Sequence, residues 1–256
     1  MTNKSLKRIV TFAALKGGIG KTTISTNVAV QAAKLGNQVL LIDLDPEACA
    51  TNALAHADVD LEQAAVFYDI LDHRCPDLES AIIPGMEKNL FLIPSALRNH
   101  HCEKKLSNQN PKKIIRSKIE SLNFDLIILE LPPSFTTLTG SAYLAADLIV
   151  LPCTPSIFSL ESVSLTIEAV SALAREFEVP EKKFKVLMNQ FNSKRIASQE
   201  VLSALKEDYS ELLLDITIGD SADISNAINA GKSVFDSKCA PKIRNSFERL
   251  TDLVIQ

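Results

Sequence analysis

A glycine-rich segment at residues 15–23, Leu-Lys-Gly-Gly-Ile-Gly-Lys-Thr-Thr, constrains the fold of this chain more than any other feature. The chain has only eight glycines in 256 residues, and three of them lie in this segment. An apolar run at 9–14 precedes it, and apolar residues at helical spacing follow it. Glycines allow backbone N–H groups to converge on an anion, and a helix N-terminus adds partial positive charge. The sequence therefore predicts a phosphate-binding loop between a strand and a helix.

The side chains of this segment favour a nucleoside triphosphate as the ligand. Lys21 can reach the β- and γ-phosphates, and the Thr22 hydroxyl can ligate Mg²⁺. The common G-x-x-x-x-G-K-S/T pattern would need glycine at position 15, but the chain has Leu15 there and a second lysine, Lys16, before the glycines. A dinucleotide-binding fingerprint fits poorly because Lys21 follows the last glycine. The predicted phosphate-binding residues are Lys16, Gly17, Gly18, Ile19, Gly20, Lys21, Thr22 and Thr23.

Strand-like and helix-like segments alternate along the whole chain. Continuous apolar strands separated by helices predict a mostly parallel sheet with helices on both faces. Because no long linker or internal repeat is present, we expect one doubly wound α/β domain over residues 1–256. The predicted strands are 9–14, 39–42, 90–93, 126–129, 148–151 and 184–188, and the predicted helices are 24–35, 64–71, 112–121, 160–177 and 243–254.

Composition excludes several classes of protein. With 27 basic and 31 acidic residues and a net charge of −4, the chain has no global attraction to nucleic acid or anionic membrane. Its five scattered cysteines contain no Cys-x-x-Cys, which disfavours a disulfide framework or a zinc site and fits a reducing compartment. The longest uncharged stretch, 131–146, contains two adjacent prolines and several hydroxyl groups and does not read as a membrane span.

Two acidic residues, Asp43 and Asp45, follow the predicted strand 39–42. Residues at i and i+2 at the end of a strand lie on one face, and ligands bind at the carboxyl ends of strands in open α/β sheets. We therefore expect both carboxylates beside the phosphate loop.

The variant K-G-G-x-G-K-T-T resembles the signature of the ParA/MinD family of deviant Walker A ATPases, and the chain looks most similar to the ParA partition ATPases. The resemblance implies a P-loop NTPase fold that binds ATP and Mg²⁺. It also implies that Lys16 reaches across an ATP-sandwich homodimer to the phosphates of the other subunit. Lys16, Lys21 and Asp45 are the catalytic candidates for slow hydrolysis of ATP to ADP and phosphate.

Further blocks of the sequence extend the resemblance. Residues 39–51 are similar to the family's D-x-D-P-Q-x-N-A-T, which implies that Asp45 orients the attacking water and that Asp43 lies close to Mg²⁺. Residues 124–134 resemble the strand that ends in D-x-P-P-S, but Glu130 stands in place of the aspartate. The implied metal residues are Thr22, Asp43 and Glu130, and the longer Glu130 puts the hydrolysis rate in question. Asn189 matches the position expected to read adenine.

The C-terminal part departs from the family's DNA-binding pattern. Residues 218–227 align with I-P-R-x-x-R-L-S-E-A, and both arginine positions hold aspartates, Asp220 and Asp223. Loss of two positive charges and gain of two negative ones predicts weak, non-specific DNA binding. The basic residues left to carry it are Lys194, Arg195, Lys242 and Arg244. The last helix mixes both charge signs on its polar face, so we expect it to pack in the core rather than bind a membrane.

The combined prediction is a ParA-like Mg-ATPase whose ATP-dependent dimer acts as a switch in DNA partition or in positioning a large cargo. A small activating partner protein and a cytoplasmic location are expected, with nucleoid association left open. Two alternatives remain. One is a small-molecule ATP-dependent ligase of the same superfamily, similar to dethiobiotin synthetase. The other is an ATP-binding interaction module that hydrolyses ATP weakly or not at all, which Glu130 would favour.

Overall fold

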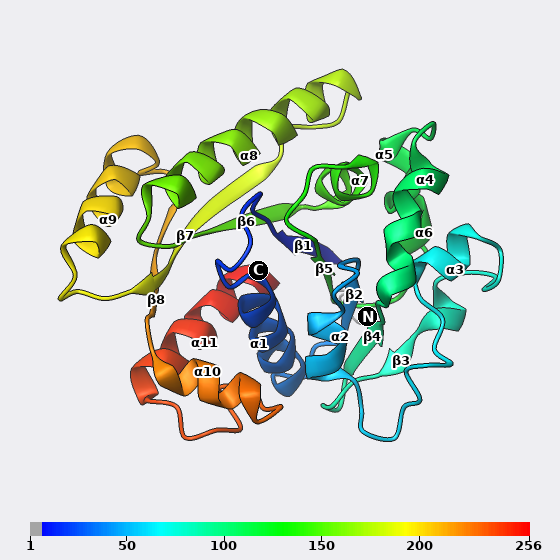
Figure 1. The fold of residues 1–256 in the computed structure, drawn as a ribbon, viewed down its shortest axis with the longest axis horizontal. Helices are drawn as coiled ribbons and strands as arrows, with labels where there is room; N and C mark the ends of the chain where they lie inside the picture. The colour runs from blue at the N-terminus through cyan, green and yellow to red at the C-terminus, as the bar shows by residue number, and fades with distance from the viewer. Residues whose placement is uncertain (1–6) are drawn as a thin grey trace, which may run out of the picture.

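The computed structural model describes residues 7–256, and their strands form a single sheet of eight in the order β3-β4-β2-β5-β1-β6-β7-β8 (Figure 1). Seven strands run parallel, and the short β3 pairs antiparallel with β4. This confirms the predicted α/β fold with a mostly parallel sheet. The strands are β1 (Arg8–Phe12), β2 (Val39–Asp43), β3 (Ile83–Pro84), β4 (Leu90–Ile93), β5 (Leu126–Glu130), β6 (Leu148–Cys153), β7 (Lys183–Phe191) and β8 (Leu213–Gly219).

Helices cover both faces of the sheet, as Figure 1 shows. One hydrophobic core lies under α3 to α9 and the other under α1, α2, α10 and α11. The first set comprises α3 (Phe67–Leu71), α4 (Cys102–Leu106), α5 (Pro111–Ile114), α6 (Arg116–Ile119), α7 (Thr137–Ala145), α8 (Ile157–Glu176) and α9 (Ile196–Asp208). The second comprises α1 (Lys21–Lys34), α2 (Cys49–Leu54), α10 (Ala222–Asn229) and α11 (Pro241–Ile255). The described residues also form two short 3-10 helices, η1 (Glu79–Ala81) and η2 (Leu97–His101).

The strand order places the glycine-rich loop at a switch point of the sheet. β1 lies between β5 and β6. The helix after β1, α1, leads to β2 on one side, whereas α7, on the opposite face, leads from β5 to β6. Connections that leave in opposite directions open a crevice at the carboxyl ends of the strands, where ligands bind in such folds. The loop that follows β1 enters this crevice.

Some predicted elements differ from the structure. The predicted helix 112–121 is divided into α5 and α6, and only residues 67–71 of the predicted helix 64–71 are helical. The latter begins late because the carboxylate of Asp69 accepts a hydrogen bond from the backbone N–H of Val66 (3.0 Å) and so caps the helix start. β8 was not predicted, because it is an edge strand whose buried residues alternate with partly exposed ones instead of forming a continuous apolar run.

The C-terminal helix α11 packs as predicted. Ile243, Phe247, Leu250 and Val254 are all buried in the core that α11 shares with α1. Among the described residues, α8 is long and apolar enough to cross a membrane by length and composition. It lies against β6 and α7, with Val163 and Val170 buried in the other core. α8 is thus one of the helices that cover the sheet.

Candidate nucleotide-binding site

The loop between β1 and α1 has the backbone shape of an anion cradle. Gly18 and Gly20 have φ angles of 74° and 89°, in the left-handed region that other residues adopt at a cost. Gly20 is the N-cap of α1, and its carbonyl accepts the first helical hydrogen bond, from Ile24 N–H (3.0 Å). No side chain caps this end of α1, so its free N–H groups face the loop. This arrangement supplies the donors that a phosphate requires.

Asn189, at the carboxyl end of β7, lies directly beneath this loop. Its Nδ2 donates a hydrogen bond to the carbonyl oxygen of Ile19 (2.8 Å), and the side chain is buried. A Cβ atom at Gly20 would lie 2.5 Å from the same Nδ2. Asn189 therefore supports the loop through its amide nitrogen. Its expected role in reading adenine stays a prediction.

The two lysines of the loop have different surroundings. Lys21 is only 7% exposed, and this burial lowers its pKa, against the opposing effect of the Glu130, Asp45 and Glu47 carboxylates. Lys16 is partly exposed, and its Nζ lies 5.7 Å from the centre of the Phe158 ring at the start of α8. Lys21 thus belongs to the interior of the site and Lys16 to its outer surface.

Glu130 ends β5 beneath the first turn of α1. Its Oε1 accepts a hydrogen bond from the Thr22 hydroxyl (2.6 Å), and its Oε2 accepts one from the Ser25 hydroxyl (2.7 Å). Glu130 is 1% exposed, and burial raises its pKa to about 7, although both hydroxyl bonds and Lys21 favour the charged form. The glutamate that replaces the family's aspartate is therefore buried, and both of its carboxylate oxygens accept hydrogen bonds from α1.

Asp43 lies opposite Glu130 in the register of β2 and β5 and is completely buried. Its Oδ2 accepts hydrogen bonds from the Thr51 N–H (2.9 Å) and hydroxyl (2.7 Å), and its Oδ1 accepts one from Asp45 N–H (3.1 Å). Burial raises the pKa of Asp43 to about 6, against the effect of these hydrogen bonds. The Thr51 hydroxyl in turn accepts the N–H of Ser95 (2.8 Å). Asp43 thus holds the 45–51 loop in place from inside.

Asp45 is partly exposed in this loop. Its Oδ1 accepts the N–H of Glu47 (3.0 Å), and its carbonyl accepts the N–H of Ala48 (2.9 Å). Ala48 has a φ of 56° and is the N-cap of α2, so the loop makes a tight turn directly after Asp45. The Asp45 carboxylate therefore lies at the carboxyl edge of the sheet, and its expected role in orienting a water molecule stays a prediction.

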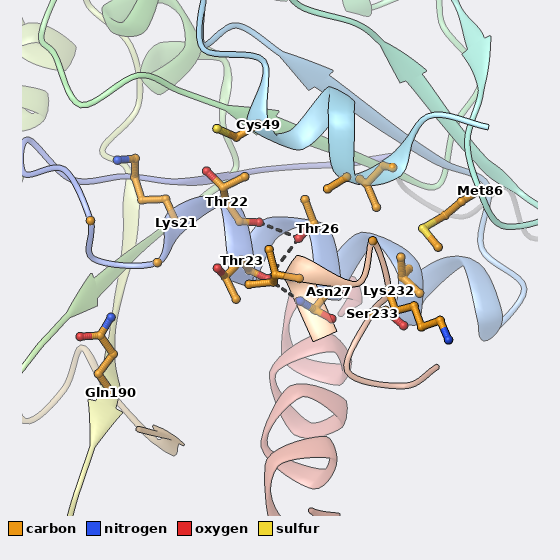
Figure 2. A pocket seen from close by; sticks show the side chains of 17 residues that line it. Lys21, Thr22, Thr23, Thr26, Asn27, Cys49, Met86, Gln190, Lys232 and Ser233 are labelled. Atoms are coloured by element: carbon orange, nitrogen blue, oxygen red, sulfur yellow. Dashed lines mark hydrogen bonds between the residues drawn. The ribbon is translucent and has the colours of Figure 1, made fainter. Parts of the chain in front are cut away.

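A cleft of about 390 Å³ runs from the phosphate loop along α1 (Figure 2). In the view, Thr23, Thr26 and Asn27 follow α1, Cys49 of α2 stands on one side, and Lys232 and Ser233 stand on the other. Its lining combines backbone and hydroxyl groups near the loop with apolar groups farther along. The lining residues are Gly18, Gly20, Lys21, Thr22, Thr23, Thr26, Asn27, Val30, Cys49, Ala53, Leu54, Met86, Gln190, Ile228, Gly231, Lys232 and Ser233. Such a cleft can accept phosphates at one end and a nucleoside beyond them.

The donor chemistry of the site fits Mg²⁺. Thr22 gives its hydroxyl hydrogen to Glu130, so its oxygen lone pairs remain for a metal at the phosphate side. Thr22 and Glu130 offer hard oxygen ligands, and Mg²⁺ usually binds through few protein oxygens together with phosphates and water. No group of three or more His, Cys, Asp or Glu side chains that could hold a metal occurs among residues 7–256. Thr22, Asp43 and Glu130 remain the predicted metal residues.

Sequence reasoning missed three contributors to this site. Ser25 lies one turn from Thr22 on the same face of α1, and its spacing of three residues was a usable signal. Thr51 is eight residues from Asp43, and the loop at 228–233 is distant in sequence. Their roles depend on tertiary contacts.

The basic residues expected to bind DNA are only partly brought together. Lys194 and Lys242 line one surface hollow that also contains Asp220. Arg195 pairs with Asp220 (3.1 Å), and Asp223 accepts the N–H of Ala240 (3.2 Å). Asp220 thus compensates one of the charges that the sequence suggested for DNA. Arg244 lies on α11, outside this hollow.

The glycine positions of the loop give a direct test of its shape. We expect Gly20→Ala to weaken nucleotide binding by at least tenfold, because the new Cβ would combine a left-handed backbone with a 2.5 Å approach to Asn189. Gly219→Ala is the control, since Gly219 ends β8 outside the phosphate loop and the nearest atom to its Cβ position, the Phe191 carbonyl oxygen, lies at an ordinary 3.9 Å. Titration with a fluorescent ATP analogue measures both. Equal affinities for the two variants would contradict this description of the loop.

Comparison with known proteins supports the same interpretation. A family model described as an AAA domain matches residues 7–186. The cell division protein PomZ of Myxococcus xanthus is 29% identical over 247 residues, which cover 95% of this chain and 76% of PomZ. The sporulation initiation inhibitor protein Soj of Bacillus subtilis is 28% identical over 230 residues, which cover 89% of this chain and 90% of Soj.

Solved structures share the fold. A Cyanothece McdA variant in complex with ATP superposes with a TM-score of 0.85 at 22% identity, covering 97% of this chain and 96% of McdA. Cobyrinic acid a,c-diamide synthase from Mycobacterium smegmatis with bound ADP and magnesium has a TM-score of 0.80 at 22% identity, covering 98% and 94%. Because the family model spans well over half of the sequence and the relatives span most of it, the chain belongs to the ParA/MinD-like family of P-loop ATPases.

Proposed function

We propose that this chain is a magnesium-dependent ATPase whose ATP-bound homodimer acts as a switch in the partition of DNA or the positioning of a large cargo. The observation that carries the proposal is the position of its two lysines. Lys21 is buried within the phosphate loop, whereas Lys16 is not among the described residues that line the cleft and instead contacts the exposed Phe158 ring. A partly exposed lysine at the rim of the phosphate loop supports a role at the nucleotide of a second subunit.

Exposed apolar side chains lie at the same edge of the sheet as the phosphate loop. Leu97, Phe135, Phe158 and Ile196 are large exposed hydrophobic residues, and they follow β4, β5, β6 and β7 respectively. All four therefore lie beyond the carboxyl ends of parallel strands, the edge at which the phosphate loop opens. Several exposed apolar groups at one edge of the sheet favour a protein contact there. This supports a second copy of the chain facing the cleft.

The chemistry is phosphoryl transfer to water, in which positioning and charge stabilisation supply most of the catalysis. The loop N–H groups and Lys21 hold the phosphates, and the Thr22 hydroxyl oxygen would be a ligand of magnesium. Magnesium, when bound, would neutralise the charge on the β- and γ-phosphates. Asp45 orients the attacking water, and Lys16 of the opposite subunit stabilises charge that develops on the transferred group.

Two other functions remain as alternatives. A small-molecule ATP-dependent ligase is favoured weakly by the fold shared with cobyrinic acid a,c-diamide synthase, and it would show turnover that depends on a second small substrate. A non-hydrolysing ATP-binding module is favoured by Glu130, and it would hold ATP unchanged. Both alternatives are separated from the proposed function by measuring ATP turnover with and without a partner. The ATPase is proposed to act in the cytoplasm with a small activating protein.

The dimer is tested with Lys16→Ala. We expect wild type to change from monomer to dimer with Mg-ATP but not with Mg-ADP, and the variant to remain monomeric, because its subunits lack the charge that reaches the opposite phosphates. Multi-angle light scattering measures the mass. Lys88→Ala, which removes an exposed lysine just before β4, at the opposite end of the strands, should dimerise like wild type. The sandwich model is wrong if wild type stays monomeric at saturating ATP or if Lys16→Ala dimerises equally well.

Hydrolysis is tested with Asp45→Ala. The variant should bind ATP with nearly unchanged affinity but lose at least tenfold in kcat and accumulate as the dimer, because only a transition-state interaction is removed. Single-turnover phosphate release and light scattering report the two effects. Asp58→Ala, at an exposed acid, is the control. A kcat within twofold of wild type would exclude Asp45 as the residue that orients water.

DNA binding is proposed to be ATP-dependent and weak. We expect random duplex to be released by about 150 mM salt, because Asp220 compensates Arg195 and few free cations remain on that surface. Asp220→Asn should shift release to higher salt, and alanine at Lys194, Arg195, Lys242 and Arg244 should abolish binding. Tight binding at this salt that survives the alanine changes would place the DNA surface elsewhere. No binding at low salt would favour a protein cargo.

A further inference from the structure

The glutamate at the end of β5 is held by two hydroxyl groups from one face of α1. Thr22 and Ser25 are three residues apart on the helix, so both point toward the same strand end. Each donates to a different oxygen of Glu130, at 2.6 Å and 2.7 Å. Ser25 is 0% exposed, and its hydroxyl also lies 3.1 Å from the Thr22 carbonyl, which is the longer of its two contacts. Both oxygens of the buried carboxylate are therefore held by hydroxyl groups of α1.

The length of the Glu130 side chain determines how its carboxylate can pair with both Thr22 and Ser25. A glutamate carboxylate extends about 1.5 Å farther from the backbone than an aspartate carboxylate, roughly one carbon–carbon bond. At this strand end, that extra reach brings the second oxygen to Ser25 while the first meets Thr22. A buried carboxylate oxygen without a donor is costly, and here the second oxygen, Oε2, lies within reach of the Ser25 hydroxyl. Ser25 thus supplies the donor for Oε2.

We propose that Ser25 is a positioning residue that acts with Glu130 as a matched pair: by binding Oε2, it orients the carboxylate so that Oε1 fixes the Thr22 hydroxyl toward the metal and phosphate side. This proposal rests on the proposed function, because it assumes that Thr22 ligates magnesium beside ATP. It implies that Glu130 is a retuned arrangement and that Glu130→Asp damages the site instead of restoring it.

The expected effects are specific to magnesium. Residues that orient a metal ligand from behind typically change metal affinity by about 10- to 100-fold. Ser25→Ala should therefore raise the Mg²⁺ concentration needed for half-maximal tightening of ATP binding by about tenfold, while binding in EDTA stays within twofold of wild type. Glu130→Asp should shift the Mg²⁺ midpoint in the same direction. Ser25→Ala on the Glu130→Asp background should add less than a further twofold shift, because the pair is already broken.

The experiment is a Mg²⁺ titration of binding to a fluorescent ATP analogue for the full chain, combined with urea unfolding without metal or nucleotide. Ser198→Ala is the matched control: Ser198 is also 0% exposed and accepts one hydrogen bond, from Asn192 N–H (3.3 Å), but lies on α9. It should lower stability without moving the Mg²⁺ midpoint. Non-additive unfolding free energies for Ser25→Ala and Glu130→Asp would show the pairing without any ligand.

Two results would overturn the proposal. A Ser25→Ala midpoint within twofold of wild type, with a stability loss like that of Ser198→Ala, would reduce Ser25 to a packing residue. A Glu130→Asp variant that binds Mg-ATP more tightly than wild type would show that Glu130 is a misfit and not half of a pair. Both results leave ATP binding by wild type intact, so they differ from failure of the proposed function, in which wild type would not bind Mg-ATP. That outcome would overturn both.

Discussion

The structure depends on placing three charged groups, Lys21, Asp43 and Glu130, together in its interior at the carboxyl ends of the central strands. Removing an ion from water costs several kcal/mol unless other groups compensate it. Here the compensation comes from the hydroxyls of Thr22, Ser25 and Thr51, from backbone N–H groups, and from the opposite charges themselves. Parallel strands in this register bring all these donors to one edge of the sheet. The same strand arrangement therefore determines both the fold and the site.

The phosphate loop and the fold class could be predicted because the residues that specify each of them lie close together in the sequence. The loop needs glycines, a lysine and a helix start within nine residues, and central strands show as continuous apolar runs. β8 was not predicted, because it is an edge strand that buries only alternate residues and so lacks the continuous apolar run used to find the other strands. Of the hydroxyl donors to Asp43 and Glu130, Thr22 was predicted as a site residue, but Ser25 and Thr51 were not. The spacing of Ser25 from Thr22 indicates a shared helix face, but the sequence does not show whether a serine or threonine hydroxyl is solvated or buried. Only the strand register β2–β5 and the position of α1 make these hydroxyls partners of carboxylates.

The sequence also does not show which surface charges are neutralised by ion pairs. Arg195 follows β7, and Asp220 follows β8, so nothing in their sequence separation suggests an ion pair. The two strands are neighbours at the edge of the sheet, which brings the loops after them together. A basic residue counted from sequence as free for DNA is thereby compensated. The net charge of a binding surface depends on which loops the topology joins, and composition alone does not contain that information.

Helix α1 connects the phosphate site to the C-terminal segment. Its first turn carries Thr22 and Ser25, and in its middle the Asn27 side-chain oxygen accepts the N–H of Val234 (2.8 Å). At its end, Lys34 pairs with Asp236, which also binds Ser233. α1 is buried along most of its length and packs against α11, so these attachments belong to one rigid unit. The first turn of α1, which carries the site hydroxyls, and the segment after α10 are therefore held to the same helix.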